Sequence, residues 1–363
     1  MNPRTLGPRK VLAALSGGVD SSVAAALLVE QGVEVIGATM KLFCYSDTPA
    51  VETSCCSLEA IEGAKGVCSK LNIPHYVLDM TREFEESVIR DFIAEYSRGR
   101  TPNPCVVCNT KVKFGSLLGR AEGLGCDAVA TGHYAKVVYE GGRLRLLKGK
   151  DPGKDQSYAL WGLTQDTLSK SLFPLGDFTK EDVRAKARGL GLRNADKPES
   201  QEICFVPDGN YAAFVAERTG DVAGDIVDGS GRPLGRHSGI ARFTIGQRSG
   251  LGISLGHPIY VTAINARRQE VRVGKDDELY QKAFSARSVN WISGQAPQGR
   301  VRALCKIRYN HEGEMGTFCL EAGNLNVTLD YPVRAITPGQ SVVFYSQEEV
   351  LGGGIIADAE EGT

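Results

Sequence analysis

Short apolar runs alternate with helical patterns over the first 130 residues of the chain. Val11–Leu15, Val33–Met40, His75–Met80 and Ala128–Thr131 are apolar runs with the length of a buried strand. Between them, apolar residues recur at every third or fourth position, which predicts helices with one buried face. The clearest of these stripes is Phe84, Val88, Phe92 and Tyr96. This alternation predicts a parallel sheet covered by helices on both faces.

Prolines and glycines interrupt the pattern in two places. Arg98–Thr110 contains two prolines, so we expect an irregular loop there rather than a regular helix. Helical periodicity returns over Lys111–Glu122. A further helix is expected over Thr179–Leu190, with Thr179 as its cap. Arg193–Gly209 then forms a second irregular stretch.

The texture of the chain changes near residue 220. Beyond it, short strand candidates are separated by Gly, Pro, Asn and Asp, and helical periodicity is scarce. We therefore expect an α/β domain over residues 1–215, a small β-rich domain over 216–280, and a β-barrel-like domain over 281–363.

Composition narrows the class of protein without indicating a partner. The 363 residues carry a net charge of -1, so charge alone neither indicates nor opposes nucleic-acid binding. No apolar run reaches the ~18 residues of a membrane helix, and residues 1–10 lack the apolar core of a signal peptide. We therefore expect a cytoplasmic protein without membrane partners, in which the ten cysteines are buried, metal-binding or catalytic.

A loop of serines and glycines between the first strand and the first helix is the strongest candidate for a binding site. Ser16–Ser22 holds two glycines and three hydroxyls, and the free N–H groups and dipole of the following helix point at the loop. Such a corner binds anions, and no lysine follows the glycines as it does in a Walker A loop. Met40 and the pair Gly132-His133 follow other strands of the same sheet, so three segments converge on one expected phosphate site.

Three cysteines lie in the two irregular stretches, where they are better placed for chemistry than buried thiols. Cys105 and Cys108 form a C-x-x-C pair, and Cys204 follows in the second stretch. The pair alone fits a redox couple, half of a zinc site or part of an iron–sulfur site. Because the chain has no second C-x-x-C, a closed four-cysteine zinc site is disfavoured.

A nucleotide loop combined with two loop cysteines favours activated sulfur transfer. One thiolate carries a second sulfur as a persulfide and attacks an electrophilic carbon, and a second thiolate releases the product by forming a disulfide. ATP makes such a carbon electrophilic by adenylating its oxygen. The remaining cysteines are expected to be buried thiols (Cys68, Cys126, Cys305 and Cys319) or to have no role (Cys44, Cys55 and Cys56).

Several motifs occur in one order along the chain from residue 11 to about 340. They are Ser16-Gly-Gly-Val-Asp-Ser21, Met40-Lys41, Arg100-Thr-Pro-Asn-Pro-Cys-x-x-Cys-Asn109, Thr131-Gly-His-Tyr134, Lys154-Asp-Gln-Ser-Tyr158, Ser200-Gln-Glu-x-Cys204-Phe205 and Phe243-Thr-Ile-Gly-Gln-Arg248. With them the chain resembles the bacterial tRNA-uridine 2-sulfurtransferases of the PP-loop ATP pyrophosphatase superfamily. The resemblance implies an N-terminal domain like the adenine-nucleotide α-hydrolases.

The resemblance also implies an enzyme that thiolates C2 of the tRNA wobble uridine while ATP becomes AMP and pyrophosphate. The implied ATP site comprises Ala14, Leu15, Ser16, Gly17, Gly18, Val19, Asp20, Ser21, Met40 and Gly132. Within it, we expect Ser16 and Ser21 to hold phosphates, and Asp20 to place Mg²⁺ or to cap the helix. Cys108 is the implied nucleophile and Cys204 the persulfide carrier. The implied substrate contacts are Asn103, Pro104 and Cys105 on the target base, and His133, Lys154, Asp155, Gln156, Arg308, Tyr309 and Gln340 on tRNA.

One position departs from the family pattern and leaves alternatives open. Many members carry Asp, assigned as a general base, where this chain has Cys105. A thiolate or water takes that role here, or Cys105, Cys108 and Cys204 bind a [4Fe–4S] cluster. A third possibility is a non-catalytic tRNA-binding or sulfur-carrier protein. The enzyme interpretations require a sulfur-donor protein, such as a cysteine desulfurase or a sulfur relay, as partner.

Overall fold

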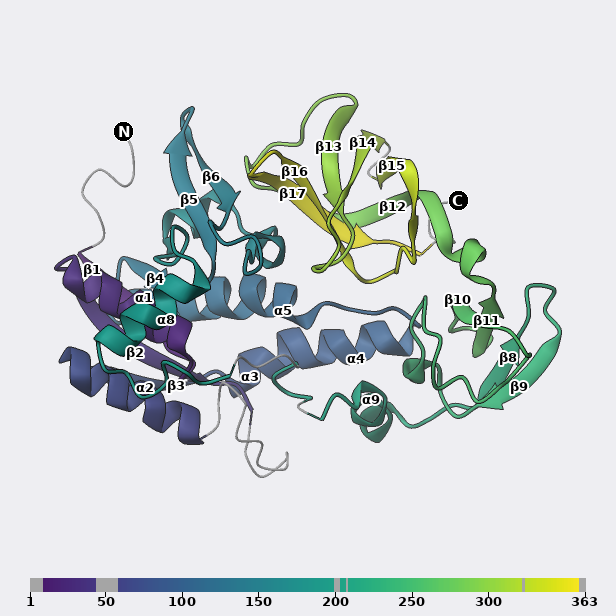
Figure 1. The fold of residues 1–363 in the computed structure, drawn as a ribbon, viewed down its shortest axis with the longest axis horizontal. Coiled ribbons are helices and arrows are strands. Elements are labelled where there is room, and N and C mark those ends of the chain that lie inside the picture. The colour runs from purple at the N-terminus through teal and green to yellow at the C-terminus, as the bar shows by residue number, and fades with distance from the viewer. Residues whose placement is uncertain (1–8, 44–57, 199–202, 207, 322–323, 359–363) are drawn as a thin grey trace.

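The computed structural model describes residues 9–43, 58–198, 203–206, 208–321 and 324–358. Figure 1 shows an α/β part at one end, a small β part at the other, and a β-barrel above the helices between them. The expected fold class, a parallel-sheet α/β domain followed by two mainly β parts, is confirmed.

Five parallel strands form the sheet of the α/β part, in the order β3-β2-β1-β4-β7. Their bounds are β1 Lys10–Ala14, β2 Glu34–Lys41, β3 His75–Asp79, β4 Ala128–Ala130 and β7 Ser171–Leu172. Successive residues of β1 point to opposite faces: Leu12 belongs to one apolar cluster, and Val11 and Ala13 belong to another. Both faces of the sheet are therefore covered, as the apolar runs predicted.

Helices cover the two faces in separate groups. Residues of α1 (Val19–Glu30) and α2 (Leu58–Leu71) join the cluster on the Val11 face. The Leu12 face carries one helical run of α3 Thr81–Phe84, η1 Glu85–Ile89 and α4 Arg90–Ser97, and a second of α5 Pro104–Val107, η2 Cys108–Ser116 and α6 Leu117–Gly123. The predicted stripe of Phe84, Val88, Phe92 and Tyr96 is buried there, so it is confirmed as core.

The second helical run starts earlier than the sequence predicted. The expectation of an irregular loop over Arg98–Thr110 is wrong from Pro104 onward. Asn103 caps the helix by accepting a hydrogen bond from the N–H of Val106 at 3.4 Å. Pro104 occupies the first turn, where a missing N–H leaves no hydrogen bond unmade. Pro102 therefore precedes the helix, Pro104 begins it, and the C-x-x-C pair lies on the helical run.

Short helices connect the remaining elements. They are η3 Ser157–Leu160, α7 Gln165–Ser169, α8 Lys180–Gly189, α9 Tyr211–Thr219, η4 Ile240–Arg242 and η5 Asp276–Leu279. The predicted cap of α8 is confirmed, because the Thr179 hydroxyl accepts from the N–H of Asp182 at 3.2 Å.

The two β parts follow in chain order. A four-stranded sheet has the order β10-β11-β8-β9, with β8 Gly224–Val227, β9 Pro233–His237, β10 Tyr260–Asn265 and β11 Glu270–Gly274. The barrel consists of β12 Tyr280–Trp291, β13 Val301–Lys306, β14 Glu314–Glu321, β15 Asn324–Arg334, β16 Ser341–Ser346 and β17 Glu349–Ile356. Pairing of β12 with both β15 and β17 closes it.

A hairpin from the first half of the chain extends the barrel sheet. Strands β5 (Ala135–Glu140) and β6 (Arg143–Lys148) form this hairpin, and β6 pairs with β17. Glu349 is 6% exposed and accepts ion pairs from Arg143 at 2.7 Å and Arg145 at 2.8 Å. The β5–β6 hairpin and the six barrel strands therefore form one eight-stranded sheet, separate from the five-stranded parallel sheet.

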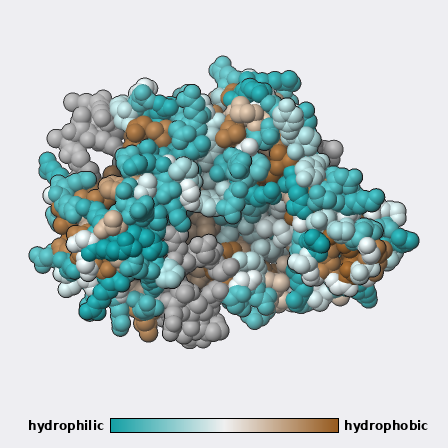
Figure 2. All heavy atoms as spheres, in the orientation of Figure 1, coloured by the Kyte–Doolittle hydropathy of each residue, from teal (hydrophilic) through white to brown (hydrophobic). Residues whose placement is uncertain are grey.

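The face drawn in Figure 2 is mostly hydrophilic, with small apolar groups scattered over all three parts. Within the described ranges, no helix is both long and apolar enough to span a membrane.

Candidate active site

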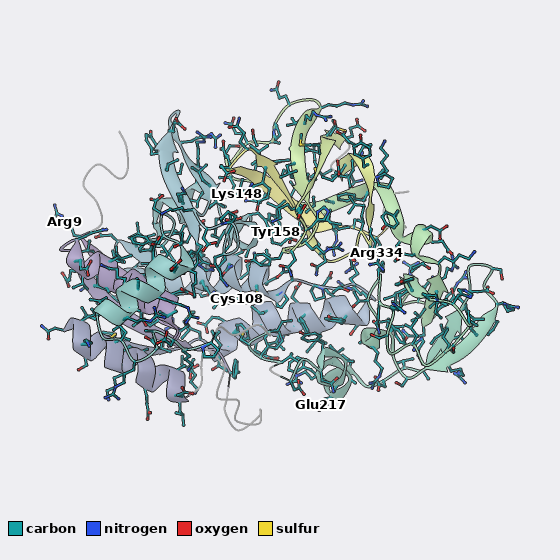
Figure 3. All side chains as sticks on the ribbon, in the orientation of Figure 1. Arg9, Cys108, Lys148, Tyr158, Glu217 and Arg334 are labelled. Atoms are coloured by element: carbon teal, nitrogen blue, oxygen red, sulfur yellow. The ribbon has the colours of Figure 1, made fainter. Side chains whose placement is uncertain are left out.

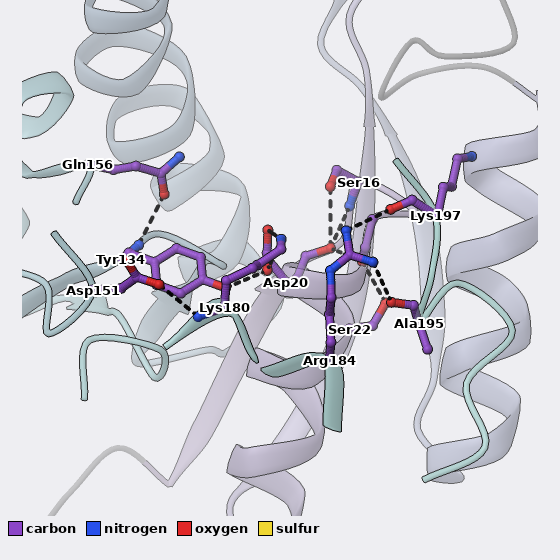
Figure 4. A network of polar contacts seen from close by, with 12 residues as sticks. Ser16, Asp20, Ser22, Tyr134, Asp151, Gln156, Lys180, Arg184, Ala195 and Lys197 are labelled. Carbon is purple, nitrogen blue, oxygen red and sulfur yellow. Dashed lines mark hydrogen bonds and ion pairs between the residues drawn. The ribbon is translucent and has the colours of Figure 1, made fainter. Parts of the chain in front are cut away.

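The loop after β1 brings its two predicted serines together. The Ser21 hydroxyl accepts from the N–H of Ser16 at 3.2 Å, and the two Oγ atoms lie 3.3 Å apart (Figure 4). Gly17 has φ +73°, and a Cβ there would lie 2.7 Å from the backbone of Ala60, so this turn requires glycine. Gly18 is the N-cap of α1, and because glycine has no side chain it makes no capping hydrogen bond. The first N–H groups of α1 therefore have no capping side chain, as an anion site needs.

Asp20 does not cap α1, so that part of the expectation is wrong. It lies in the first turn, and its carboxylate accepts hydrogen bonds from the Tyr134 hydroxyl at 2.7 Å and from Lys180 Nζ at 2.8 and 2.7 Å (Figure 4). Asn194 holds the same loop by donating to the Gly17 carbonyl at 3.0 Å. Neither Lys180 nor Asn194 was expected at this site from the sequence. The one available signal was that Lys180 follows the predicted helix cap Thr179.

Gly132 packs directly against the start of α1. A Cβ at this position would lie 2.7 Å from the backbone nitrogen of Ser21 and 2.8 Å from the carbonyl carbon of Asp20. Met40, at the end of β2, packs against the apolar cluster that Ala14 also contacts. The predicted nucleotide residues thus come from three strand ends that lie together, as expected for a parallel sheet.

The two candidate sulfur-transfer cysteines share this apolar cluster. Cys108 is buried in it at 8% exposure, and Cys204 packs against it half-buried, as does Met40. Cys105 is exposed on the same helix as Cys108. Figure 3 shows Cys108 near the middle of the molecule. Both thiols therefore lie in the apolar cluster on the Leu12 face of the sheet, which Ala14 and Met40 also contact.

The cysteines do not fit an iron–sulfur cluster in this arrangement. Within the part of the chain that the structure describes, no three His, Cys, Asp or Glu side chains are grouped to hold a metal ion. Cys105 faces solvent while Cys108 is buried. A cluster on Cys105, Cys108 and Cys204 would require these side chains to rearrange. Mg²⁺ requires less of the protein, because it commonly binds one or two carboxylates together with substrate phosphates.

The other thiols have structural surroundings. Burial raises the pKa of Cys68 to about 11 and that of Cys305 to about 12, so both stay protonated and unreactive at neutral pH. Cys319 is not buried as expected, because it lies on the outer side of β14 with its Sγ 3.3 Å from a Glu321 oxygen. Cys44, Cys55, Cys56 and residues 200–202 of the Cys204 motif lie outside the described residues.

The 148–158 loop is shaped by two of its three implied tRNA residues. Asp155 accepts from the N–H of Gly149 and from the N–H and hydroxyl of Ser157 at 2.9–3.1 Å. Gln156 pairs with the backbone of Tyr134 through its side chain and its N–H. Lys154 is half-buried at the turn of the loop.

His133 lies inside the protein. It is 8% exposed, packs against the rings of Phe114 and Phe173, which also contact each other, and its Nδ1 is 2.7 Å from the Thr131 hydroxyl. Burial, with a smaller contribution from the Lys113 charge, lowers its pKa well below the ordinary value. The imidazole is therefore neutral and is not presented to a macromolecular ligand in this conformation.

The barrel residues contact the rest of the protein in different ways. Tyr309 is 42% exposed, and its ring packs edge-on against buried Tyr158. Arg308 is half-buried with Nη1 3.4 Å from the Arg334 carbonyl. Gln340 donates to the carbonyl of Thr101 at 2.8 Å, just before the cysteine helix. Gln340 thus joins the barrel to the segment that carries Asn103 and the cysteines.

A buried network of ion pairs forms a second connection between the barrel and the segment before the cysteine helix. Arg100 donates to both Glu95 oxygens at 2.8 and 2.7 Å and to Asp358 at 2.9 Å, and Arg287 of β12 reaches Glu95 at 3.2 Å. Burial raises the pKa of Glu95, but the hydrogen bonds and charges of the three surrounding arginines outweigh it and hold the pKa below its usual range. The helix that precedes the cysteines is therefore locked to the barrel.

Comparisons with known proteins agree along the whole chain. Residues 9–208 match the family model described as the tRNA methyl transferase HUP domain, 212–275 its PRC-barrel domain, and 281–356 the aminomethyltransferase beta-barrel domain. A curated relative named tRNA-specific 2-thiouridylase MnmA from Acetivibrio thermocellus is 50% identical over 97% of this chain and 100% of its own length. The chain belongs to the tRNA-specific 2-thiouridylase family.

Another member of the 2-thiouridylase family, from Geotalea uraniireducens, is also 50% identical, over 97% of this chain and 96% of its own length. A solved 4-thiouridine synthetase–RNA complex with bound ATP aligns with 58% of this chain and 50% of that chain at 18% identity and a TM-score of 0.35, too low to inform the site. Membership of the 2-thiouridylase family makes the chain an enzyme and confirms the family resemblance of its motifs.

Proposed function

We propose that this enzyme uses ATP to thiolate C2 of the wobble uridine of tRNA, with sulfur carried as a persulfide on Cys204. The observation that carries the proposal is that Cys108 and Cys204 share one apolar cluster with Ala14 and Met40, on the sheet whose strand β1 leads into the uncapped start of α1. Family membership supports thiolation over methyl transfer, and sulfur transfer gives both cysteines a task.

Nucleotide binding is assigned to the loop and strand ends. The N–H groups at the start of α1 and the hydroxyls of Ser16 and Ser21 bind the phosphates, and Gly132 lets the segment after β4 pack closely against the start of that helix. Met40 packs at the adenosine side. The C2 oxygen of uridine attacks the α-phosphorus, forming a C2–O–AMP bond and releasing pyrophosphate. Mg²⁺ would bind the phosphate oxygens of ATP and of the released pyrophosphate. The proposed ATP site also includes Ala14, Leu15, Gly17, Gly18, Val19 and Asp20.

Sulfur transfer then takes place in two steps, one at Cys204 and one at Cys108. The terminal sulfur of the Cys204 persulfide attacks C2, and AMP leaves with the bonding electron pair. Cys108 attacks the Cys204 sulfur, which breaks the S–S bond to the transferred atom and leaves C2=S on the base. The product disulfide joins Cys108 and Cys204, and an external thiol returns both to the reduced state. A sulfur-donor protein reloads Cys204.

The tRNA contacts are assigned to residues on both sides of the cysteine helix. Asn103 and Pro104, which precede exposed Cys105, are assigned to the target base. Lys154 and Arg308 supply charge to phosphates and Tyr309 supplies an exposed ring. His133, Asp155, Gln156 and Gln340 act behind these groups by shaping the surface. We assign catalysis to residues 1–215, and tRNA docking to 216–280 and 281–363 as well.

The central experiment measures 2-thiouridine in tRNA by mass spectrometry after incubation with ATP, Mg²⁺ and a sulfur donor. Cys204→Ser and Cys108→Ser are each expected to abolish thiolation, while Cys319→Ser, which removes a thiol from the barrel, keeps it. Pyrophosphate release should persist in Cys204→Ser, because adenylation precedes sulfur transfer. Equal thiolation by Cys204→Ser and the wild type would refute the persulfide step. If the wild type releases no pyrophosphate with tRNA present, the chain is a tRNA-binding or sulfur-carrier protein instead.

Substitution of Cys105 separates the remaining two mechanisms. A general-base role predicts that Cys105→Asp retains thiolation, whereas Cys105→Ala loses it and changes the pH profile of kcat. A [4Fe–4S] mechanism predicts that anaerobically purified wild type contains iron and that Cys105→Asp loses both iron and activity. Full activity without iron removes the cluster mechanism.

A further inference from the structure

We propose that Lys180 is a positioning residue of the nucleotide site, which acts by neutralising and holding Asp20 at the start of α1. This inference rests on the proposed function, since it assigns a role within the ATP site. The nucleotide loop itself has no lysine, and Lys180 reaches it from α8, in a different segment of the chain.

The contacts of Asp20 define what its carboxylate is available to do. It accepts three hydrogen bonds, two from Lys180 Nζ at 2.7 and 2.8 Å and one from the Tyr134 hydroxyl at 2.7 Å (Figure 4). An ionised carboxylate offers about four acceptor positions. The carboxylate is therefore engaged in holding protein groups, which makes it a poor ligand for Mg²⁺ in this arrangement.

Charge explains why the pair stands at this place. Asp20 lies one residue before Ser21, in the helical turn whose N–H groups face the proposed triphosphate. An uncompensated carboxylate there would repel the phosphates, because like charges brought together at a binding site oppose binding. The side chain of Lys180 is 12% exposed and pairs with Asp20, which cancels that charge without filling the anion site.

The same cluster joins the nucleotide loop to the 148–158 loop. The N–H of Lys180 donates to Asp151 at 2.9 Å, and the backbone of Tyr134 pairs with Gln156. Lys180 and Tyr134 therefore each contact Asp20 on one side and the loop with the implied tRNA residues on the other. This placement predicts that loss of Lys180 weakens ATP binding more than it slows catalysis.

A charge-deletion cycle tests the proposal in the full-length protein. ATP affinity is measured by titration calorimetry, and KM and kcat by pyrophosphate release with tRNA, for the wild type, Lys180→Met, Asp20→Asn and the double variant. We expect Lys180→Met to raise the Kd and KM for ATP about tenfold or more with a smaller change in kcat. The double variant should recover most of that loss, and Lys180→Arg should bind ATP close to the wild-type level.

Lys186→Met is the matched control. Lys186 pairs with Glu30 at 2.8 Å between the same two helices, α8 and α1, but at the far end of α1. It should leave the Kd for ATP unchanged, and an equal rise in Lys186→Met would overturn the proposal in favour of general helix packing.

The remaining outcomes are also decisive. If the double variant binds ATP no better than Lys180→Met, Lys180 acts on the nucleotide directly and the proposal is wrong. If Asp20→Asn alone is as defective as Lys180→Met, Asp20 binds the metal and the proposal is wrong. A wild type that binds ATP but releases no pyrophosphate refutes the proposed function, while the calorimetric cycle still decides the role of Lys180. Absence of ATP binding by the wild type overturns both.

Discussion

The side-chain amide of Gln340 donates to the carbonyl of Thr101 at 2.8 Å, across 239 residues of sequence. Its second contact is the Pro102 carbonyl at 3.3 Å, and the N–H of Thr101 donates to the Pro338 carbonyl at 2.9 Å. A barrel loop therefore holds the segment that leads into the cap of the cysteine helix. The position of Cys108 depends on the barrel although the two lie in different parts of the protein.

Gln340→Ala tests whether this contact serves catalysis. A hydrogen bond is worth about 0.5–1.5 kcal/mol net, so we expect kcat for thiolation to fall about three- to tenfold with KM for tRNA unchanged. Steady-state kinetics on both substrates give the result, and Gln281→Ala, at an exposed barrel position, is the control. A raised KM for tRNA with unchanged kcat would instead support the direct tRNA contact that the family resemblance implies.

Arg100→Met should destabilise the protein strongly. Arg100 is 5% exposed, and its loss leaves buried Glu95 without its main partner, which costs about 3–5 kcal/mol. Urea unfolding measures the loss. Arg98→Met is matched, because Arg98 also pairs with Glu95 but from an exposed position, where a pair is worth about 0–1 kcal/mol. Equal losses in the two variants would contradict a buried network.

Gly132→Ala should abolish ATP binding with a modest effect on the fold elsewhere. The added Cβ would meet the backbone at Ser21 and Asp20 at 2.7–2.8 Å, so the start of α1 must move away from β4. Titration with ATP measures the effect. Gly66→Ala, at an open position in α2, should bind ATP normally and gain about 0.5–1 kcal/mol of stability. Normal ATP binding by Gly132→Ala would place the nucleotide elsewhere.

His133 should make stability fall as the pH drops below neutrality. Its folded pKa lies well below the unfolded value of about 6.5, first because of burial and then because of the Lys113 charge. Below about pH 6.5 the unfolded chain therefore binds a proton at His133 and the folded chain does not. The free energy of unfolding accordingly decreases as the pH falls below that value. His133→Gln should flatten this part of the profile in urea unfolding, and exposed His257→Gln should not. Identical slopes for the wild type and His133→Gln would show that His133 is accessible to protons in the folded state.

Local signals were enough to predict the α/β part and the serine–glycine loop between β1 and α1. The stripe from Phe84 to Tyr96 lies on one helix face, so period alone located it. The two prolines led to the wrong prediction of a loop over Arg98–Thr110. A proline in a helix interior would break the helix, whereas Pro104 lies in the first turn, where proline favours a helix. Only the Asn103 cap distinguishes the two cases, and it depends on a single side-chain contact.

Contacts between distant segments left no such signal. Lys180 meets Asp20 because α8 packs beside α1, and Gln340 meets Thr101 because the barrel closes against the cysteine helix. Neither pairing follows from spacing or composition. The family resemblance implies that Gln340 and His133 contact tRNA, whereas in the structure Gln340 donates to a backbone carbonyl and His133 packs against two aromatic rings.

The sheet shared by β6 and β17 has a consequence for how the chain is made. Leu146 on β6 and Trp161 are buried against strands that include Val350 and Gly353, about 200 residues later. At ribosomal rates of about 5–20 residues per second, these apolar surfaces wait roughly 10–40 s for their partners. The hairpin therefore presents an unpaired sheet edge throughout that interval, so the nascent chain carries an exposed site for wrong strand pairing until the barrel is made.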